Sequence, residues 1–76
     1  MELNLQNRNL LKTFGKNLEI CLHLIGSRPE SLALRCNEDL LTILGFKFGL
    51  GELDQDLLKR ICDDIGIAKD LILSEY

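Results

Sequence analysis

Apolar residues recur at intervals of three and four through the first third of the chain. Leu11, Phe14, Leu18, Leu22 and Ile25 keep this spacing, which places them on one face of a helix. Asn9 is suited to cap a helix over residues 10–25, although the helix could also begin near residue 4. The pattern predicts an amphipathic N-terminal helix, in which Gly15 costs about 1 kcal/mol relative to alanine.

The next segment opens with residues typical of a helix start. Ser27 and Glu30 have the spacing of a capping box, and Pro29 suits a first turn because its missing N–H has no partner there. Asn37, followed by two acidic residues, is a second start signal. The segment is therefore either one helix or two short helices broken near Asn37.

Three of the periodic stretches end on a glycine, at Gly26, Gly45 and Gly66. Glycine adopts a positive φ without steric cost, so it is the usual left-handed stop of a helix. Asp54 is placed to cap the helix that ends at Gly66, and a last helix begins near Ala68. We interpret all three glycines as helix stops.

Residues 45–51 contain three glycines and two of the three phenylalanines. So many glycines in so short a stretch predict a connector. Its apolar side chains, Phe46, Phe48 and Leu50, need an apolar environment, either in the core or in a partner protein.

Together these elements predict an all-α fold, a compact bundle of four to five short helices in a single helical domain over residues 1–76. A chain of 76 residues buries only about 60% of the surface that its unfolded state exposes. Apolar residues make up 46% of it, so we expect another chain to cover some of them. We predict a homo-oligomer that self-associates through the N-terminal helix, with a seam formed by Leu11, Phe14, Leu18 and Ile25.

Cysteine usage and hydropathy indicate a cytoplasmic protein. The three cysteines lie far apart and form no closely spaced pair, as expected of free thiols in a reducing compartment. The longest nearly apolar run covers residues 18–25, whereas spanning a membrane takes about 20 apolar residues. The first residues lack the basic and apolar pattern of a secretory signal. We therefore expect no membrane association.

No motif for catalysis or for a cofactor stands out. The only histidine, His23, has Cys21 or Cys36 as its possible nucleophilic partner, and no spacing of metal ligands or phosphate-binding glycines occurs. We predict that the protein is not an enzyme and that it uses no cofactor and no metal.

Charge is divided along the chain, whose net charge is −3. Residues 1–28 carry four cations against two acids, including the basic stripe Arg8, Lys12 and Lys16, whereas residues 52–76 carry seven acids against three cations. The two regions form faces that either meet each other or are separately solvated. The acidic balance argues against a general nucleic-acid binder.

These features predict a small non-enzymatic cytoplasmic regulator or adaptor that acts through protein–protein interaction. Apolar anchors and charge steering are the usual means of such binding. The anchors are expected to be Phe46, Phe48 and Leu50, and the acidic residues that attract a basic partner are Asp54, Asp56, Asp63 and Asp64. A small-molecule sensor with a ligand held between helices near the same anchors is a further alternative.

Residues 58–76 also resemble the pattern of a helix-turn-helix DNA-binding motif. The matching positions are Ile61, Cys62, Ile65, Gly66, Ile67 and Ile72. The resemblance implies a DNA-binding transcriptional regulator that acts as a dimer. Its DNA contacts would come from Lys69, Ser74 and Tyr76, and its phosphate contacts from Arg8, Lys12 and Lys16. Because Lys69 is the only cation of the recognition segment, this is the second hypothesis.

Overall fold

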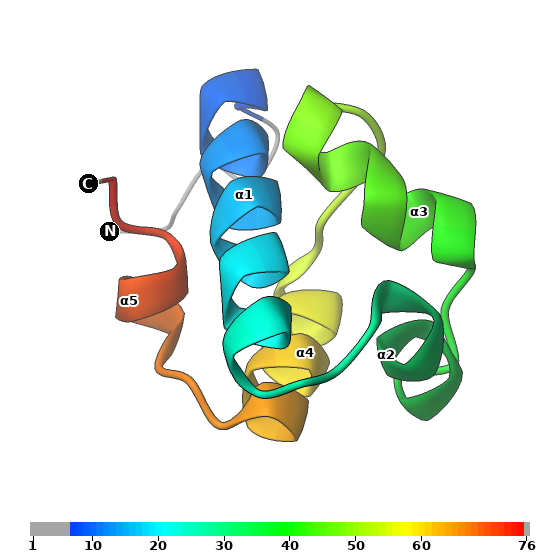
Figure 1. Cartoon of the computed structure of the whole chain (residues 1–76). Coiled ribbons are helices and arrows are strands. Elements are labelled where there is room, and N and C mark those ends of the chain that lie inside the picture. The colour runs from blue at the N-terminus through cyan, green and yellow to red at the C-terminus, as the bar shows by residue number, and fades with distance from the viewer. Residues whose placement is uncertain (1–6, 76) are drawn as a thin grey trace.

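The structure is a computed structural model and describes residues 7–75. In this range the helices are α1 Arg8–Leu24, α2 Pro29–Arg35, α3 Leu40–Gly45, the 3-10 turn η1 Phe46–Phe48, α4 Gln55–Ile65 and α5 Lys69–Ile72 (Figure 1). No strand occurs in the described range, so the predicted all-α bundle of short helices is confirmed. None of the helices within residues 7–75 has the length and apolar character to cross a membrane.

Helix α1 is the central element of the bundle. It contacts α3 and η1 on one side and α5 on the other, while α4 contacts α2 and α5 (Figure 1). Phe14 of α1 packs edge-on against Phe46 of η1, with the ring centroids 5.5 Å apart. The buried core takes side chains from every element: Leu11, Phe14, Leu18, Leu22, Leu32, Ala33, Cys36, Ile43, Phe46, Leu53, Leu57, Leu58, Ile61, Cys62 and Ile72.

The cap of α1 lies two residues earlier than predicted. The Asn7 side-chain oxygen accepts hydrogen bonds from the backbone N–H groups of Asn9 and Leu10, at 2.9 and 3.3 Å. Asn9 therefore lies inside the first turn, where it cannot act as the cap. The alternative start near residue 4 falls outside the described residues.

The capping box predicted at the start of α2 is absent. Arg28 occupies the cap position, without a side-chain cap, and the Ser27 hydroxyl instead accepts a hydrogen bond from Arg35 at 3.2 Å. Pro29 lies in the first turn, as predicted. The break near Asn37 is confirmed, because that residue has a φ of 53° and separates α2 from α3.

Gly45 is not a helix stop, contrary to the prediction. Its φ is −72°, and the chain continues helically into η1 until Gly49, whose φ is 75°. The N–H of Gly49 donates to the carbonyl of Phe46 at 2.9 Å and closes the last turn. Gly66 does end α4, with a φ of 73°, and Asp54 caps that helix as predicted.

Gly15 lies where the backbones of α1 and η1 make their closest approach. A Cβ atom at Gly15 would lie 2.6 Å from the carbonyl carbon of Phe46 and still closer to the backbone of Lys47. Real Cβ atoms do not tolerate such contacts, so only glycine allows this crossing. The packing of the two elements explains why a residue of low helix propensity occurs in the middle of α1.

A buried asparagine joins α1 to the C-terminal segment. The Asn17 side-chain amide donates to the carbonyl oxygens of Ile72 and Ser74, both at 2.8 Å. Asn17 is only 7% exposed, so its amide depends on these two acceptors for the hydrogen bonds it loses in leaving water. This contact fixes α5 and the residues after it against the middle of α1.

Candidate protein-interaction site

An exposed apolar face runs along the continuous helical stretch of α3 and η1. Leu41, Leu44 and Phe48 are separated by three and four residues, which places them on one side of the helix. Their exposed fractions are 75%, 36% and 63%. Sequence reasoning missed Leu41 and Leu44, because the predicted stop at Gly45 separated them from Phe48.

Leu50 extends this face. Its N–H donates to the carbonyl of Gly45 at 3.1 Å, which folds the chain back over the end of α3. A Cβ atom at Gly45 would lie 3.4 Å from the Cβ of Leu50, so the leucine side chain covers that glycine. Leu50 is itself 57% exposed. We call Leu41, Leu44, Phe48 and Leu50 the apolar strip.

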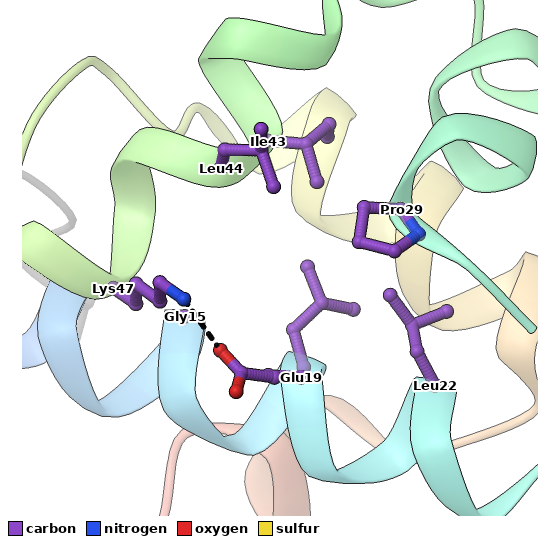
Figure 2. A pocket seen from close by; sticks show the side chains of 8 residues that line it. Gly15, Glu19, Leu22, Pro29, Ile43, Leu44 and Lys47 are labelled. Atoms are coloured by element: carbon purple, nitrogen blue, oxygen red, sulfur yellow. Dashed lines mark hydrogen bonds and ion pairs between the residues drawn. The ribbon is translucent and has the colours of Figure 1, made fainter.

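A small apolar notch opens beside Leu44, between α1, α2 and α3 (Figure 2). Its volume is about 30 Å³, which is the space of one methyl group or one water molecule. Lys47 and Glu19 are also among the lining residues and form an ion pair of 3.0 Å. The notch can take the tip of an apolar side chain. Its other lining residues are Gly15, Leu18, Leu22, Pro29 and Ile43.

Exposed cations lie along α1, and the side chain of one of them, Lys12, borders the strip at its η1 end. The side chain of Lys12 lies across Gly49, since a Cβ atom there would be 3.2 Å from the Cε of Lys12. Arg8 and Lys16 lie one helical turn before and after Lys12 and are exposed. No ion-pair partner of these three cations occurs among residues 7–75. We call Arg8, Lys12 and Lys16 the basic edge.

The structure separates the three anchors predicted from the sequence. Phe46 is fully buried and packs on Phe14, so the prediction that it contacts a partner is wrong. Its ring fills the space where η1 crosses α1. Phe48 and Leu50 are exposed, as a binding surface requires, and the Nζ of Lys47 lies 5.3 Å from the centre of the Phe48 ring.

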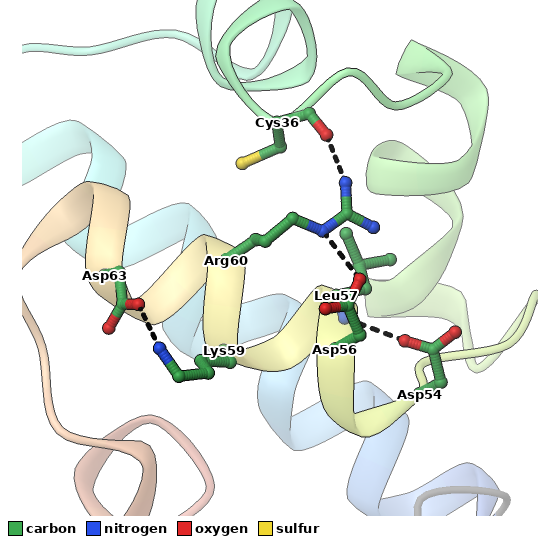
Figure 3. A network of polar contacts seen from close by, with 7 residues as sticks. All are labelled: Cys36, Asp54, Asp56, Leu57, Lys59, Arg60 and Asp63. Carbon is green, nitrogen blue, oxygen red and sulfur yellow. Dashed lines mark hydrogen bonds and ion pairs between the residues drawn. The ribbon is translucent and has the colours of Figure 1, made fainter.

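The four predicted acidic residues have partners within the chain, and Figure 3 shows those of Asp54, Asp56 and Asp63. Asp54 accepts the N–H of Leu57 at 2.7 Å as the cap of α4. The other three form ion pairs of 2.8 to 3.0 Å: Asp56 with Arg60, Asp63 with Lys59 and Asp64 with Arg35. The ion pairs compensate the charges of these three carboxylates. All four acids lie at the start of α4 or along it, rather than on α3 and η1, so the structure does not bring them to the apolar strip.

Two of these contacts have further effects. Arg60 also donates to the backbone carbonyl of Cys36 and so links α4 to the end of α2 (Figure 3). The hydrogen bond that the Lys59 ammonium donates to the Asp63 carboxylate raises the pKa of Lys59. The four acidic residues therefore stabilise α4 itself and its packing against α2.

The predicted self-association seam is also divided. Leu11, Phe14 and Leu18 are buried within the monomer, so the prediction that they face a second copy is wrong. All three belong to the core of the same chain, where Phe14 packs against Phe46. Ile25 is exposed, as are Ile20 and Leu24, which sequence reasoning did not single out. Self-association stays a prediction, and Ile25 is the only one of its four residues that is exposed.

The turn between α4 and α5 follows the pattern of the helix-turn-helix resemblance. Gly66 is left-handed, and the N–H of Ile67 donates to the carbonyl of Cys62 at 3.1 Å. However, α5 has four residues, whereas a recognition helix needs several turns to contact bases in a groove. Lys69 is exposed at its start, and the Ser74 hydroxyl donates to the carbonyl of Leu71. Tyr76 lies outside the described residues.

The buried cysteines belong to the core. Burial raises the pKa of the Cys36 and Cys62 thiols, and the nearby Asp64 and Asp63 carboxylates raise them further. A nucleophilic cysteine needs the opposite shift, so these two thiols act as small apolar side chains. No group of three metal-ligating side chains comes together within residues 7–75.

Comparisons with protein-family models, with characterised proteins and with solved structures found no match to this chain.

Proposed function

We propose that this protein is a non-enzymatic regulator or adaptor that binds an amphipathic helix of a partner protein on the apolar strip. The observation that carries the proposal is the exposure of Leu41, Leu44 and Phe48 on one face of a continuous helix. Seven residues separate the first from the last, which corresponds to about 10 Å, or two helical turns. A partner helix presents apolar residues at the same spacing, so the two faces interdigitate.

Phe48 is the expected anchor of the complex. Aromatic residues near the centre of an interface account for a large share of binding energy, because they bury much apolar area at little cost in side-chain entropy. The notch beside Leu44 offers a second point of contact for an apolar side chain of the partner. Three free cysteines support a location in the reducing cytoplasm.

The test is affinity capture from cell extract with two matched variants, Phe48→Asp and Leu34→Asp. Leu34 on α2 is 84% exposed, so both variants place a carboxylate at an exposed apolar position, but only one changes the strip. We expect Phe48→Asp to lose a partner that wild type and Leu34→Asp retain. Circular dichroism checks that both variants remain folded. Equal capture by all three proteins would contradict the proposal.

A further inference from the structure

The two ends of the apolar strip differ in charge. Lys12 lies against Gly49, the residue between Phe48 and Leu50 in the chain, with Arg8 and Lys16 one helical turn before and after it on α1. At the other end, Glu38 and Asp39 precede α3 and therefore lie before Leu41. A partner thus meets cations at the η1 end of the strip and carboxylates at the α3 end.

The cations of the basic edge form no ion pair within residues 7–75, and Lys16 lines a surface hollow together with Glu75. Four other cations, Arg35, Lys47, Lys59 and Arg60, form ion pairs within the chain. Lys47 also lies near the Phe48 ring, but the Glu19 carboxylate at 3.0 Å compensates its charge. Within the part of the chain that the structure describes, the basic edge therefore dominates the electrostatics next to Phe48.

We propose, on the basis of the function proposed above, that the partner helix is acidic where it covers Phe48 and Leu50. Its apolar face packs on the strip, and its carboxylates lie next to Lys12 within reach of Arg8 or Lys16. Such pairs at the rim of an interface determine which partner binds and in which direction, more than how tightly it binds. The acids at the Leu41 end disfavour the reverse orientation of the same helix.

A second possible source of negative charge is an anionic membrane, and the observations favour the protein helix. The chain carries a net charge of −3, and Glu38 and Asp39 would face the same lipid headgroups that the basic edge attracts. An anionic membrane surface repels the carboxylates of Glu38 and Asp39. A partner helix whose acids lie only at its Phe48 end brings no negative charge next to these two residues.

The test is a fluorescence-anisotropy titration of the full chain with three labelled 18-residue helical peptides. All three share one face of leucines at helical spacing, and the positions beside that face at one end are all Glu, all Gln or all Lys. At 50 mM salt we expect the Glu peptide to bind about fivefold more tightly than the Gln peptide, and the Lys peptide to bind most weakly. The preference should shrink at 500 mM salt, because exposed charges are screened.

Charge reversal of the basic edge provides the matched variant. The double substitution Arg8→Glu and Lys12→Glu should reverse the order of the peptides, while Lys69→Glu on α5 should leave it unchanged. If all three peptides bind equally and Phe48→Asp abolishes their binding, helix binding stands and the inferred acidic partner is overturned. If none of them binds, the proposed function fails. Binding to phosphatidylserine vesicles in preference to the Glu peptide would also overturn the inference.

Discussion

Replacing Gly15 by alanine tests the close approach between the backbones of α1 and η1. Helix propensity alone predicts that alanine in the middle of α1 stabilises the protein by about 1 kcal/mol. The structure predicts the opposite, because the new methyl group would overlap the backbone of Phe46 and Lys47. Backbone atoms cannot rotate away as a flexible side chain can, so α1 and η1 must separate.

The magnitude follows from these two opposing effects. Overpacking of a dense core costs about 1–3 kcal/mol, and a clash with backbone belongs at the upper end of this range. After subtracting the gain of about 1 kcal/mol from helix propensity, we expect Gly15→Ala to lower the free energy of unfolding by about 2 kcal/mol. For a domain of this size the melting temperature then falls by about 8–16 °C.

Urea unfolding followed by circular dichroism measures this change, and Gly45→Ala is the matched control. Gly45 also has a helical φ, of −72°, but the atoms nearest to a Cβ there all belong to Leu50 and lie at ordinary contact distances of 3.4 Å or more. The control should gain about 0.4–1 kcal/mol, since alanine reduces the entropy of the unfolded chain. If Gly15→Ala is as stable as the wild type, the close crossing of α1 and η1 is refuted.

Three further predictions concern the core. Asn17→Ala should cost about 1–3 kcal/mol and speed amide exchange in the C-terminal segment, and unchanged exchange would argue against the two hydrogen bonds of this side chain. Phe46→Ala should cost about 3–5 kcal/mol in thermal unfolding, whereas Phe48→Ala should change stability by less than about 0.5 kcal/mol, because only the first ring is buried. Burial raises the pKa of Cys36 and Cys62 above 9.0. Their contribution to the free energy of unfolding is therefore complete below pH 9 and decreases above it, because the thiols of the unfolded chain lose their protons at a lower pH than the buried thiols do. Urea unfolding at pH 8 and 10.5 measures how far the free energy of unfolding falls between the two. The fall should be smaller in the double variant Cys36→Ala and Cys62→Ala than in the wild type, and an equal fall would contradict this prediction.

The sequence predicted those features of the fold that depend on local chemistry. The apolar period of α1, the cap at Asp54 and the stop at Gly66 each arise within one helix and its flanking residues. The capping box at Ser27 failed because α2 begins one residue later, with Arg28 in the cap position. A shift of one residue in a helix start cannot be read from spacing alone.

The site was harder to predict because exposure depends on tertiary contacts. Phe46 and Phe48 are two residues apart in the same glycine-rich segment, yet one ring enters the core and the other remains in water. Which ring turns inward depends on where η1 crosses α1, and that crossing is determined by the missing side chain of Gly15. Had residues 40–48 been treated as one helical stretch, the spacing of Leu41, Leu44 and Phe48 would have indicated the strip.

The contact between Asn17 and the C-terminal segment has a consequence for synthesis of the protein. The acceptors of its amide lie 55 and 57 residues further along the chain. Translation at about 5–20 residues per second separates Asn17 from Ser74 by about 3–11 s. During that interval the amide stays hydrated and the side of α1 that receives α5 is uncovered. The nascent chain therefore completes its core only after Ile72 has left the ribosome, and the amide of Asn17 gains its second acceptor only after Ser74 has followed.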